Sequence, residues 1–382
     1  MEEKTVADTR ILDLAIQSIA SSGSGVGFID EEGFTRPVFV RYTVPGDVVR
    51  AQVSRRYKRY YEASLVEILT PSPQRVIPLC PHFGVCGACD FLHMSYEQQL
   101  RSKEALLRQA LERSGLTIEH VMIVQADHPL RYRAKVRVFS RDGVVGFSAR
   151  KSNEVVPIAH CDIVREELNA VFGEQSLPRG EHAFAYDERS ARITDSECFY
   201  TVEDCVLAFH PKGFVQSNLG MNARLVRLVL SLIPKGTVLD LYAGNGNFSV
   251  PLAKRGDAVV AVEGDARGYS LLRSNALANG VTIAAHREDV KDYLRANQIT
   301  QASVLLDPPR TGAADVIACL GAAAQTIVYV SCDARTLSKD LASLCAGGYT
   351  ISSVHMIDMF PQTRHVETVV CLRKDGSAQN SI

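Results

Sequence analysis

The stretch TVLDLYAGNGNFSVPLA at residues 237–253 joins an apolar run to a glycine-containing turn and then to a helix-forming segment. Gly244 and Gly246 let the backbone turn tightly and approach a ligand, and the start of the helix offers free amide donors. A second apolar run, AVVAVEGD, reaches Glu263, which lies 17 residues after Gly246. An acidic side chain at the end of that strand can hold both hydroxyls of a ribose. Together these features predict a nucleoside-binding unit and disfavour a plain turn followed by an exposed glutamate.

The turn differs from the dinucleotide-binding motif G-x-G-x-x-G, because Ser249 stands where that motif has its third glycine. An adenosyl ligand is therefore favoured over a dinucleotide. Asp240, inside the apolar run, is expected to support the loop rather than to touch the ligand.

Strands alternate with helical stretches from about residue 236 onward. The predicted strands are Val238–Tyr242, Ala258–Val262, Val304–Leu306 and Ile327–Val330. This alternation is typical of a doubly wound parallel sheet. The predicted fold class is therefore α/β, with a Rossmann-like domain in the carboxyl-terminal half.

The first 70 residues contain short apolar runs punctuated by glycine, which favour a small OB-like β-barrel. TPSPQRVIP at 70–78 has three prolines and predicts a linker. A helix is expected to follow, because Ser95 and Gln98 form a capping box. Strand-like runs return after it in a central region rich in β-strands. The predicted domains are 1–70, 71–212 and 213–382.

Composition indicates a globular protein, since 46% of the 382 residues are hydrophobic and 22% are charged. No run approaches the roughly 18 apolar residues that a membrane helix needs. The polar start MEEKTVADTR does not resemble a secretory signal. We therefore expect a cytoplasmic protein without membrane contact, and we infer no obligate protein partner. Ten cysteines are many for that compartment unless several have a function, because disulfides rarely persist there.

The net charge of −1 gives no overall attraction to nucleic acid, but two windows are basic. Residues 50–61 contain five Lys or Arg and three tyrosines, with no acid. Residues 131–151 contain seven Lys or Arg against Asp142 alone. Basic and apolar residues alternate over 131–138, which predicts a strand with one basic face. A solvated strand face and an RNA-binding surface both fit, and tyrosines that can stack on bases support the second.

Two further strand ends carry groups suited to catalysis. VLLDPPRTGA at 304–313 places Asp307 at the carboxyl end of a predicted strand, where ligands bind in open α/β sheets. VYVSCDARTL at 328–337 repeats this arrangement with Cys332. A helix start after Cys332 is expected to lower the pKa of the thiol and make it a nucleophile. A lone cysteine is more often a small buried hydrophobe, but the adjacent adenosyl site favours the nucleophile.

A thiol nucleophile suits the methylation of uracil, whose carbon 5 reacts poorly by itself. Addition of a thiolate at carbon 6 turns the ring into an enolate, and carbon 5 can then attack the methyl group of a sulfonium. A base must afterwards remove the hydrogen from carbon 5 so that the thiol can leave. Glu367, in RHVETVVCL at 364–372, is a candidate for that base. An exposed glutamate at the start of a strand is an equally good interpretation.

A cysteine cluster lies in LCPHFGVCGACDFLH at 79–93, which contains Cys80, Cys86 and Cys89. Clustered thiols in a cytosolic chain indicate a metal site. The candidate for a fourth ligand is Cys161, and nearby histidines are expected to pack or to lie at the surface. Zinc and a 4Fe-4S cluster both suit four thiolates.

Taken together, these motifs resemble the RNA uracil-5-methyltransferases, especially the iron–sulfur type that acts on 23S ribosomal RNA (rRNA), over nearly the whole chain. The segment 1–70 looks like a TRAM domain, an OB-like RNA-binding module. CPHFGVCGAC at 80–89, with Cys161, resembles the 4Fe-4S motif of that family, which implies iron–sulfur rather than zinc. FVQSN at 214–218 resembles the segment whose glutamine contacts S-adenosylmethionine.

The resemblance also implies roles for single residues. Cys332 falls on the position of the nucleophile, and Glu367 falls on the position of the base that takes the proton from carbon 5. The implied contacts to S-adenosylmethionine are Gln216, Tyr242, Asn247, Glu263, Asp289 and Asp307. The implied reaction is methylation of carbon 5 of a uridine in RNA. The 23S rRNA is favoured over transfer RNA (tRNA), because the barrel and the cluster occur together in the ribosomal type.

One departure from the family pattern is Asp333–Ala334, where the family usually has Asn-Pro after the nucleophile. Two rival functions also have to be separated from this one. An amino-group methyltransferase, which the DPPR loop distantly suggests, needs no cysteine nucleophile. A non-catalytic iron–sulfur RNA-binding protein needs no cofactor-binding turn.

Overall fold

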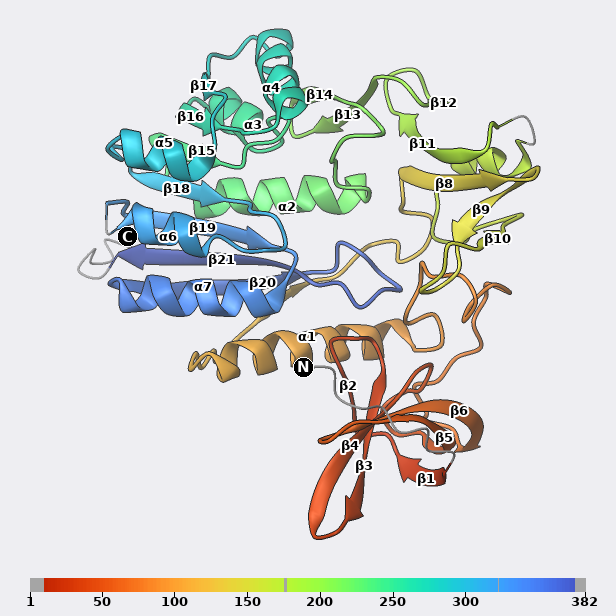
Figure 1. Ribbon diagram of the computed structural model, residues 1–382. Coiled ribbons are helices and arrows are strands. Elements are labelled where there is room, and N and C mark those ends of the chain that lie inside the picture. Colours follow the sequence, from red (N-terminus) through yellow and green to blue (C-terminus); the bar gives the residue numbers. More distant parts are fainter. Residues whose placement is uncertain (1–9, 175–176, 322, 375–382) are drawn as a thin grey trace. The chain divides into compact units, whose positions relative to one another are not determined.

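The structure is a computed structural model that describes residues 10–174, 177–321 and 323–374 (Figure 1). The chain forms two compact units. Unit 1 consists of Met1–Leu106, Gly146–Ile158 and Pro361–Arg364, and unit 2 consists of Leu107–Val145, Ala159–Phe360 and His365–Ile382. The division into domains 1–70, 71–212 and 213–382 stays a prediction.

Unit 1 contains a six-stranded sheet, drawn in red and orange in Figure 1. Its strands are β1 (Ile11–Ala15), β2 (Ser18–Ile19), β3 (Gly25–Glu31), β4 (Phe34–Val40), β5 (Val48–Arg56) and β6 (Tyr61–Thr70). They lie in the order β1-β5-β6-β4-β3-β2, antiparallel except for the β4–β6 pair. Leu14, Val38 and Val49 are among the side chains of its core. Gly25 has to be glycine, because a Cβ there would lie 2.0 Å from Thr43 Oγ1.

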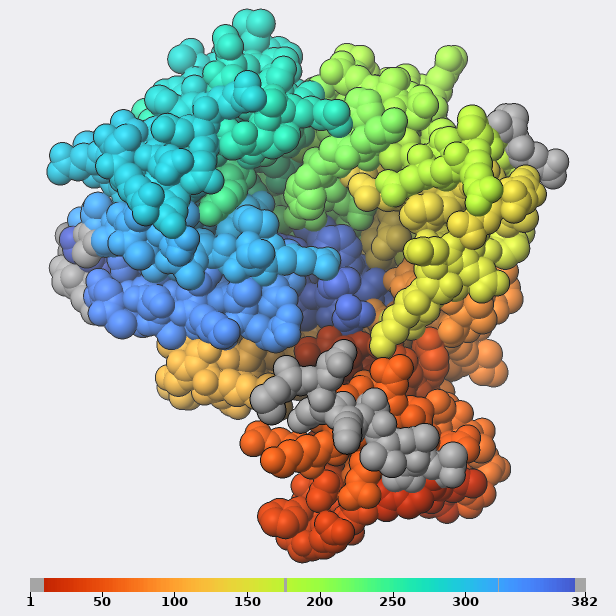
Figure 2. Space-filling view, viewed as in Figure 1, coloured from red at the N-terminus to blue at the C-terminus, as the bar shows by residue number. Residues whose placement is uncertain are grey.

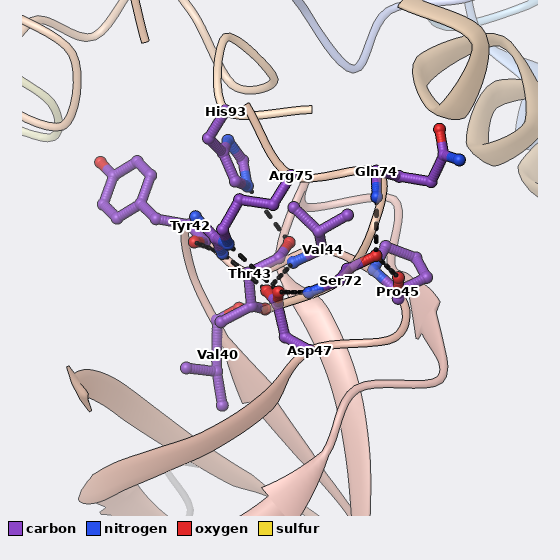
Figure 3. A network of polar contacts seen from close by, with 10 residues as sticks. All are labelled: Val40, Tyr42, Thr43, Val44, Pro45, Asp47, Ser72, Gln74, Arg75 and His93. Atoms are coloured by element: carbon purple, nitrogen blue, oxygen red, sulfur yellow. Dashed lines mark hydrogen bonds and ion pairs between the residues drawn. The ribbon is translucent and has the colours of Figure 1, made fainter. Parts of the chain in front are cut away.

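The segment 70–78, predicted as a linker, is tied to the turn between β4 and β5 by a buried carboxylate (Figure 3). Asp47 accepts hydrogen bonds from two backbone amides at 2.6 and 2.8 Å and pairs with Arg75 at 2.6 Å. Burial alone would raise the pKa of Asp47, but these partners lower it below its ordinary value. His93 packs beside them with Nε2 3.2 Å from the Thr43 carbonyl oxygen, and burial lowers its pKa to about 4. The segment is therefore fixed at this point.

Unit 2 contains an eight-stranded sheet in the order β17-β16-β15-β18-β19-β21-β20-β7. These strands are β7 (Met122–Val124), β15 (Thr237–Leu241), β16 (Ala258–Val262), β17 (Ala284–His286), β18 (Ser303–Leu306), β19 (Thr326–Ser331), β20 (Tyr349–Ile357) and β21 (Glu367–Lys374). Neighbours from β17 to β19 are parallel, and β21 is antiparallel to both β19 and β20. The predicted Rossmann-like sheet is confirmed.

The helices of this sheet are α2 (Leu219–Leu232), α3 (Ser249–Arg255), α4 (Ala266–Ala278), α5 (Val290–Ala296), α6 (Ala314–Leu320) and α7 (Ala334–Ala346). Helices α2, α3 and α4 contact one another in one row, and α5, α6 and α7 do so in another, as in a doubly wound fold. Every residue of β18 and β19 is buried, which explains their continuous apolar sequences. In the space-filling view, the residues of this sheet and its helices are drawn from green to blue, with a hollow between the green and the blue residues (Figure 2).

The remaining elements are α1 (Tyr96–Arg113), η1 (Glu166–Gly173), β8 (Lys135–Arg141), β9 (Val144–Ser148), β10 (Val155–Pro157), β11 (Gly180–Asp187), β12 (Arg192–Thr194), β13 (Cys198–Val202) and β14 (Cys205–Phe209). Helix α1 confirms the predicted helix, and Ser95 Oγ accepts a hydrogen bond from the Gln98 amide at 3.2 Å. The strand predicted over 131–138 begins only at Lys135. The prediction of one basic face is confirmed in β8, where Lys135 and Arg137 alternate with the buried Val136 and Val138, although Lys135 is itself half-buried. Arg131 has a positive φ of 54° and lies before the strand.

Each helix in the described part of the chain is too short or too polar to cross a membrane.

Candidate active site

The predicted site residues of unit 2 gather at the carboxyl edge of the parallel strands. Tyr242 follows β15, Glu263 follows β16, Asp289 follows β17, Asp307 follows β18, and Cys332 follows β19. Ligands in open α/β sheets bind at this edge. The sheet topology therefore brings residues from distant parts of the sequence into one region.

Cys332 and Glu367 lie next to each other through the pairing of β19 with β21. Ser331 is opposite Thr368, and the next residues along this antiparallel register are Cys332 and Glu367. The negative charge of Glu367 acts on the thiol, and that of Asp307 acts on Glu367. A nucleophile and a carboxylate therefore share one end of the sheet.

Two of the acids at this edge have raised pKa values. Glu367 is 2% exposed, and burial, then Asp307, raise its pKa well above the ordinary value, while Arg310 opposes the rise. The pKa of Asp307 is raised to about 7, first by burial and then by Asp240. Raised pKa values favour the protonated acids, and a nearby cation, such as the sulfonium of S-adenosylmethionine, would favour their ionised forms.

The Cys332 thiol is half-buried, and its pKa is raised to about 11 by burial and then by Glu367. The expectation that the following helix lowers this pKa is therefore wrong. Helix α7 does follow the thiol, but the Asp333 carboxylate caps it and accepts hydrogen bonds from two amides of its first turn, at 2.9 and 3.3 Å. These amides are already satisfied and cannot stabilise a thiolate. Asp333, which stands where the family usually has asparagine, thus caps helix α7.

Arg310 and Asp340 were not singled out from the sequence, but both act at this edge. The positive charge of Arg310 acts on the Cys332 thiol, lowers its pKa against the effect of burial, and so favours the thiolate. Asp340, buried on α7, holds the loop that carries Arg310, because it accepts hydrogen bonds from the Ala313 amide at 2.7 Å and the Tyr329 hydroxyl at 2.6 Å. The DPPR motif offered a signal for Arg310. Asp340 offered none, because its role depends on α7 packing beside that loop.

The turn after β15 has the tight geometry that its glycines predict. Tyr242, Gly244 and Gly246 have positive φ angles of 67°, 57° and 89°. A Cβ on Gly246 would lie 2.8 Å from a side-chain carbon of α4. Glu263 accepts hydrogen bonds from the amides of Gly244 at 2.7 Å and Asp265 at 2.6 Å. The glutamate is thereby held beside the turn, where the ribose-binding prediction needs it.

Asp240 supports this turn, as expected, because its buried carboxylate accepts a hydrogen bond from the Ser249 hydroxyl. Burial is the main cause that raises the pKa of Asp240 to about 7. The side chain therefore acts from beneath the turn.

The other three predicted cofactor residues, Asn247, Asp289 and Gln216, differ in their hydrogen bonds and in their exposure. Asn247 exchanges two hydrogen bonds with Asn222, at 2.8 and 3.0 Å, and accepts one from the Tyr200 hydroxyl at 2.9 Å, so its amide is engaged within the protein. Asp289 is exposed and caps α5. Gln216 is 7% exposed in the loop before α2.

The predicted metal ligands are divided between the units. Cys80, Cys86 and Cys89 lie half-buried on one loop of unit 1, and Cys161 is buried in unit 2. The loop folds back on itself, with the Cys86 amide 2.9 Å from the His82 carbonyl oxygen. Among the residues with described positions, no three His, Cys, Asp or Glu side chains are grouped so as to hold a metal ion. The donor chemistry of four thiols nevertheless suits an iron–sulfur cluster.

Comparison with known proteins identifies the class. The sequence matches the family described as tRNA (Uracil-5-)-methyltransferase over residues 188–375. Relatives of the same activity class match along nearly all of the sequence. The chain belongs to the RNA uracil-5-methyltransferase family.

Two of these relatives are named 23S rRNA (uracil(1939)-C(5))-methyltransferase RlmD. The protein from Halomonas elongata is 31% identical, and the match covers 96% of this chain and 90% of the relative. The protein from Vibrio parahaemolyticus is 30% identical, with 98% of each chain covered. In fold, the chain is similar to the Pyrococcus abyssi tRNA (uracil-54, C5)-methyltransferase in complex with S-adenosyl-L-homocysteine. That similarity has a TM-score of 0.76 at 22% identity and covers 94% of this chain and 99% of that one.

Proposed function

We propose that this protein transfers a methyl group from S-adenosylmethionine to carbon 5 of a uridine in 23S rRNA through a covalent adduct with Cys332. The observation that carries the proposal is the adjacent pair of Cys332 and Glu367 at the carboxyl edge of the sheet. A thiol and a buried carboxylate are the two groups that this reaction requires. The relatives named above support 23S rRNA as the substrate, and tRNA is the alternative.

In this mechanism Cys332 adds its sulfur to carbon 6 of the uracil, and the ring becomes an enolate. Arg310 favours the thiolate that performs this addition, which matters because the pKa of the thiol is raised to about 11. S-adenosylmethionine supplies a sulfonium methyl group for carbon 5. Glu367 then takes the proton from carbon 5, and the electrons of that C–H bond expel the Cys332 sulfur from carbon 6. Burial makes Glu367 a stronger base than an exposed glutamate.

We assign the cofactor contacts to the loop before α2 and to the carboxyl ends of the parallel strands. Glu263 would bind the ribose hydroxyls, since the backbone amides that hold it leave lone pairs on both carboxylate oxygens. The remaining contacts would come from Gln216, Tyr242, Asn247, Asp289 and Asp307. For Asn247 the contact would have to be shared with Asn222.

The proposal includes two RNA-related features of the amino-terminal half. We assign residues 1–70 as a TRAM-like RNA-binding module, supported by the six-stranded sheet and by the basic residues of its β5–β6 hairpin. We assign Cys80, Cys86, Cys89 and Cys161 as ligands of a 4Fe-4S cluster. The cluster is proposed to be structural, because methyl transfer moves no electrons to or from the protein.

Replacing Cys332 with alanine tests the proposal. The variant should form neither 5-methyluridine nor a covalent RNA adduct, and its turnover should fall by at least ~10³-fold. Cys319→Ala, at a half-buried cysteine of α6, is the matched control and should retain activity. Methylation that survives in Cys332→Ala would indicate an amino-group methyltransferase. Failure of the unaltered protein to bind S-adenosylmethionine would indicate a non-catalytic RNA-binding protein.

A further inference from the structure

The loop 213–218, which carries Gln216, is held at both ends by β8 and the residue before it. The Ala134 amide donates a hydrogen bond to the Ser217 carbonyl oxygen at 2.7 Å. Lys135 Nζ donates a hydrogen bond to the Gly213 carbonyl oxygen. All of these residues belong to unit 2. One pair of adjacent residues therefore fixes the start and the end of the loop.

Lys135 makes its contact from an unfavourable place for a cation. Its side chain is half-buried, and burial, then the charge of Arg137, lowers its pKa to about 8. An ammonium in such a position costs free energy unless it is well bonded, and a charged donor forms a stronger hydrogen bond to a carbonyl than a neutral one. A methionine could fill the same space without that cost. The contact with Gly213 is therefore a reason for lysine to be here.

The far end of the loop is secured without Lys135. Asn218 Nδ2 donates to the Met359 carbonyl oxygen at 3.1 Å, and Asn218 Oδ1 accepts from the Met221 amide at 3.2 Å and so caps α2. Between the two fixed ends, Gln216 is buried while Phe214 is 81% exposed. The near end, at Gly213, is bonded to the preceding turn and to the Lys135 ammonium. Loss of the ammonium would loosen the half of the loop that precedes Gln216.

We propose that Lys135 is a positioning residue that fixes the loop 213–218 and thereby holds Gln216 ready to bind S-adenosylmethionine. The inference rests on the cofactor role proposed for Gln216. In unliganded protein without this contact, the loop would sample other conformations, and binding would have to select the competent one. The effect would fall on cofactor affinity and not on the chemical step.

The test compares Lys135→Met with Lys135→Arg in the full-length protein. The methionine variant should raise the KM and the Kd for S-adenosylmethionine by about tenfold or more, with kcat at saturating cofactor within about twofold. The arginine variant keeps a cationic donor and should recover most of the affinity. Arg137→Met is the matched control, because Arg137 is an exposed neighbour on β8 that pairs with Glu181 at 3.2 Å. Its cofactor affinity should be unchanged.

Cofactor affinity in Lys135→Met equal to that of the unaltered protein would overturn the inference, as would a fall in kcat alone. If the methionine variant does not fold, Lys135→Gln replaces it in the test. Comparing the cofactor affinity of this uncharged variant with that of Lys135→Arg then shows the effect of the positive charge. Gln216→Ala separates this inference from the function on which it rests. If Gln216→Ala binds S-adenosylmethionine normally, the assignment of Gln216 fails. If it loses affinity and Lys135→Met does not, only the role of Lys135 fails.

Discussion

The buried carboxylate of Glu367 lies beside the Cys332 thiol, so charging both groups at once is unfavourable. Burial raises both pKa values, and each negative charge would disfavour the other. Before reaction this pair favours the protonated forms. Once the Cys332 sulfur is bonded to carbon 6 it carries no negative charge, and Glu367 can ionise more easily to take a proton. The two residues are thus suited to act one after the other, Cys332 first and Glu367 second.

Glu367→Gln should let the reaction start but not finish. Cys332 can still add to carbon 6 and methyl transfer can follow, but no carboxylate is present to remove the proton from carbon 5. Methylated RNA should therefore remain bound to Cys332, visible as a slowly migrating protein–RNA band on a denaturing gel with labelled RNA. The unaltered protein should give the same band with 5-fluorouridine RNA, because fluorine cannot leave as a cation. Normal turnover in Glu367→Gln would remove Glu367 from the mechanism.

The β5–β6 hairpin combines positive charge with aromatic rings in unit 1. Tyr57 and Tyr60 stack with their ring centroids 4.2 Å apart, and the Tyr57 amide bonds to the Tyr60 carbonyl oxygen at 2.9 Å. Lys58 and Arg59 lie exposed between them. This hairpin tip is a better test of RNA binding than Arg133 and Lys135, which are half-buried.

Reversing the charge of Lys58 and Arg59 to glutamate should weaken RNA binding and flatten its dependence on salt. The slope should fall by roughly 0.7 for each lost phosphate contact on single-stranded RNA. Affinity for S-adenosylmethionine should not change. Arg295→Glu, at an exposed position on α5, is the control for a change in net charge. RNA affinity that is the same in the double variant and in this control would mean that the hairpin is a solvated surface.

At the scale of the whole molecule, the proposed cluster would take three ligands from the loop at residues 80–89 and the fourth from Cys161, far along the chain. A cofactor whose ligands are distant in the sequence stabilises the folded chain, because the unfolded chain has no preformed site. The proposed role is therefore in folding and not in the chemistry.

Protein purified without oxygen should be brown and contain iron, with visible absorbance from sulfur-to-iron charge transfer. Cys161→Ala should reduce the yield of folded protein and its iron content more than it reduces the turnover of the fraction that folds. Cys319→Ala should change neither quantity. Stoichiometric zinc without iron in the anaerobic preparation would exclude the iron–sulfur assignment.

Local patterns determined the strand–turn–helix unit around Gly244 and Gly246, the alternation of strands and helices, and helix α1. Each depends on residues close together in the sequence, and the structure confirms each of them. The half-buried state of Lys135 was not predictable, because it depends on the loop that packs against β8.

The pairing of Cys332 with Glu367 was decided only by the tertiary structure. It exists because β21 inserts antiparallel between β19 and β20, a register that no local pattern specifies. The raised pKa of the thiol has the same origin, since it is caused by burial and by a neighbour 35 residues away. The sequence determined which chemical groups are present and on which kind of element they lie. Long-range packing decided which of them meet and in which protonation state, because burial and charge act through space.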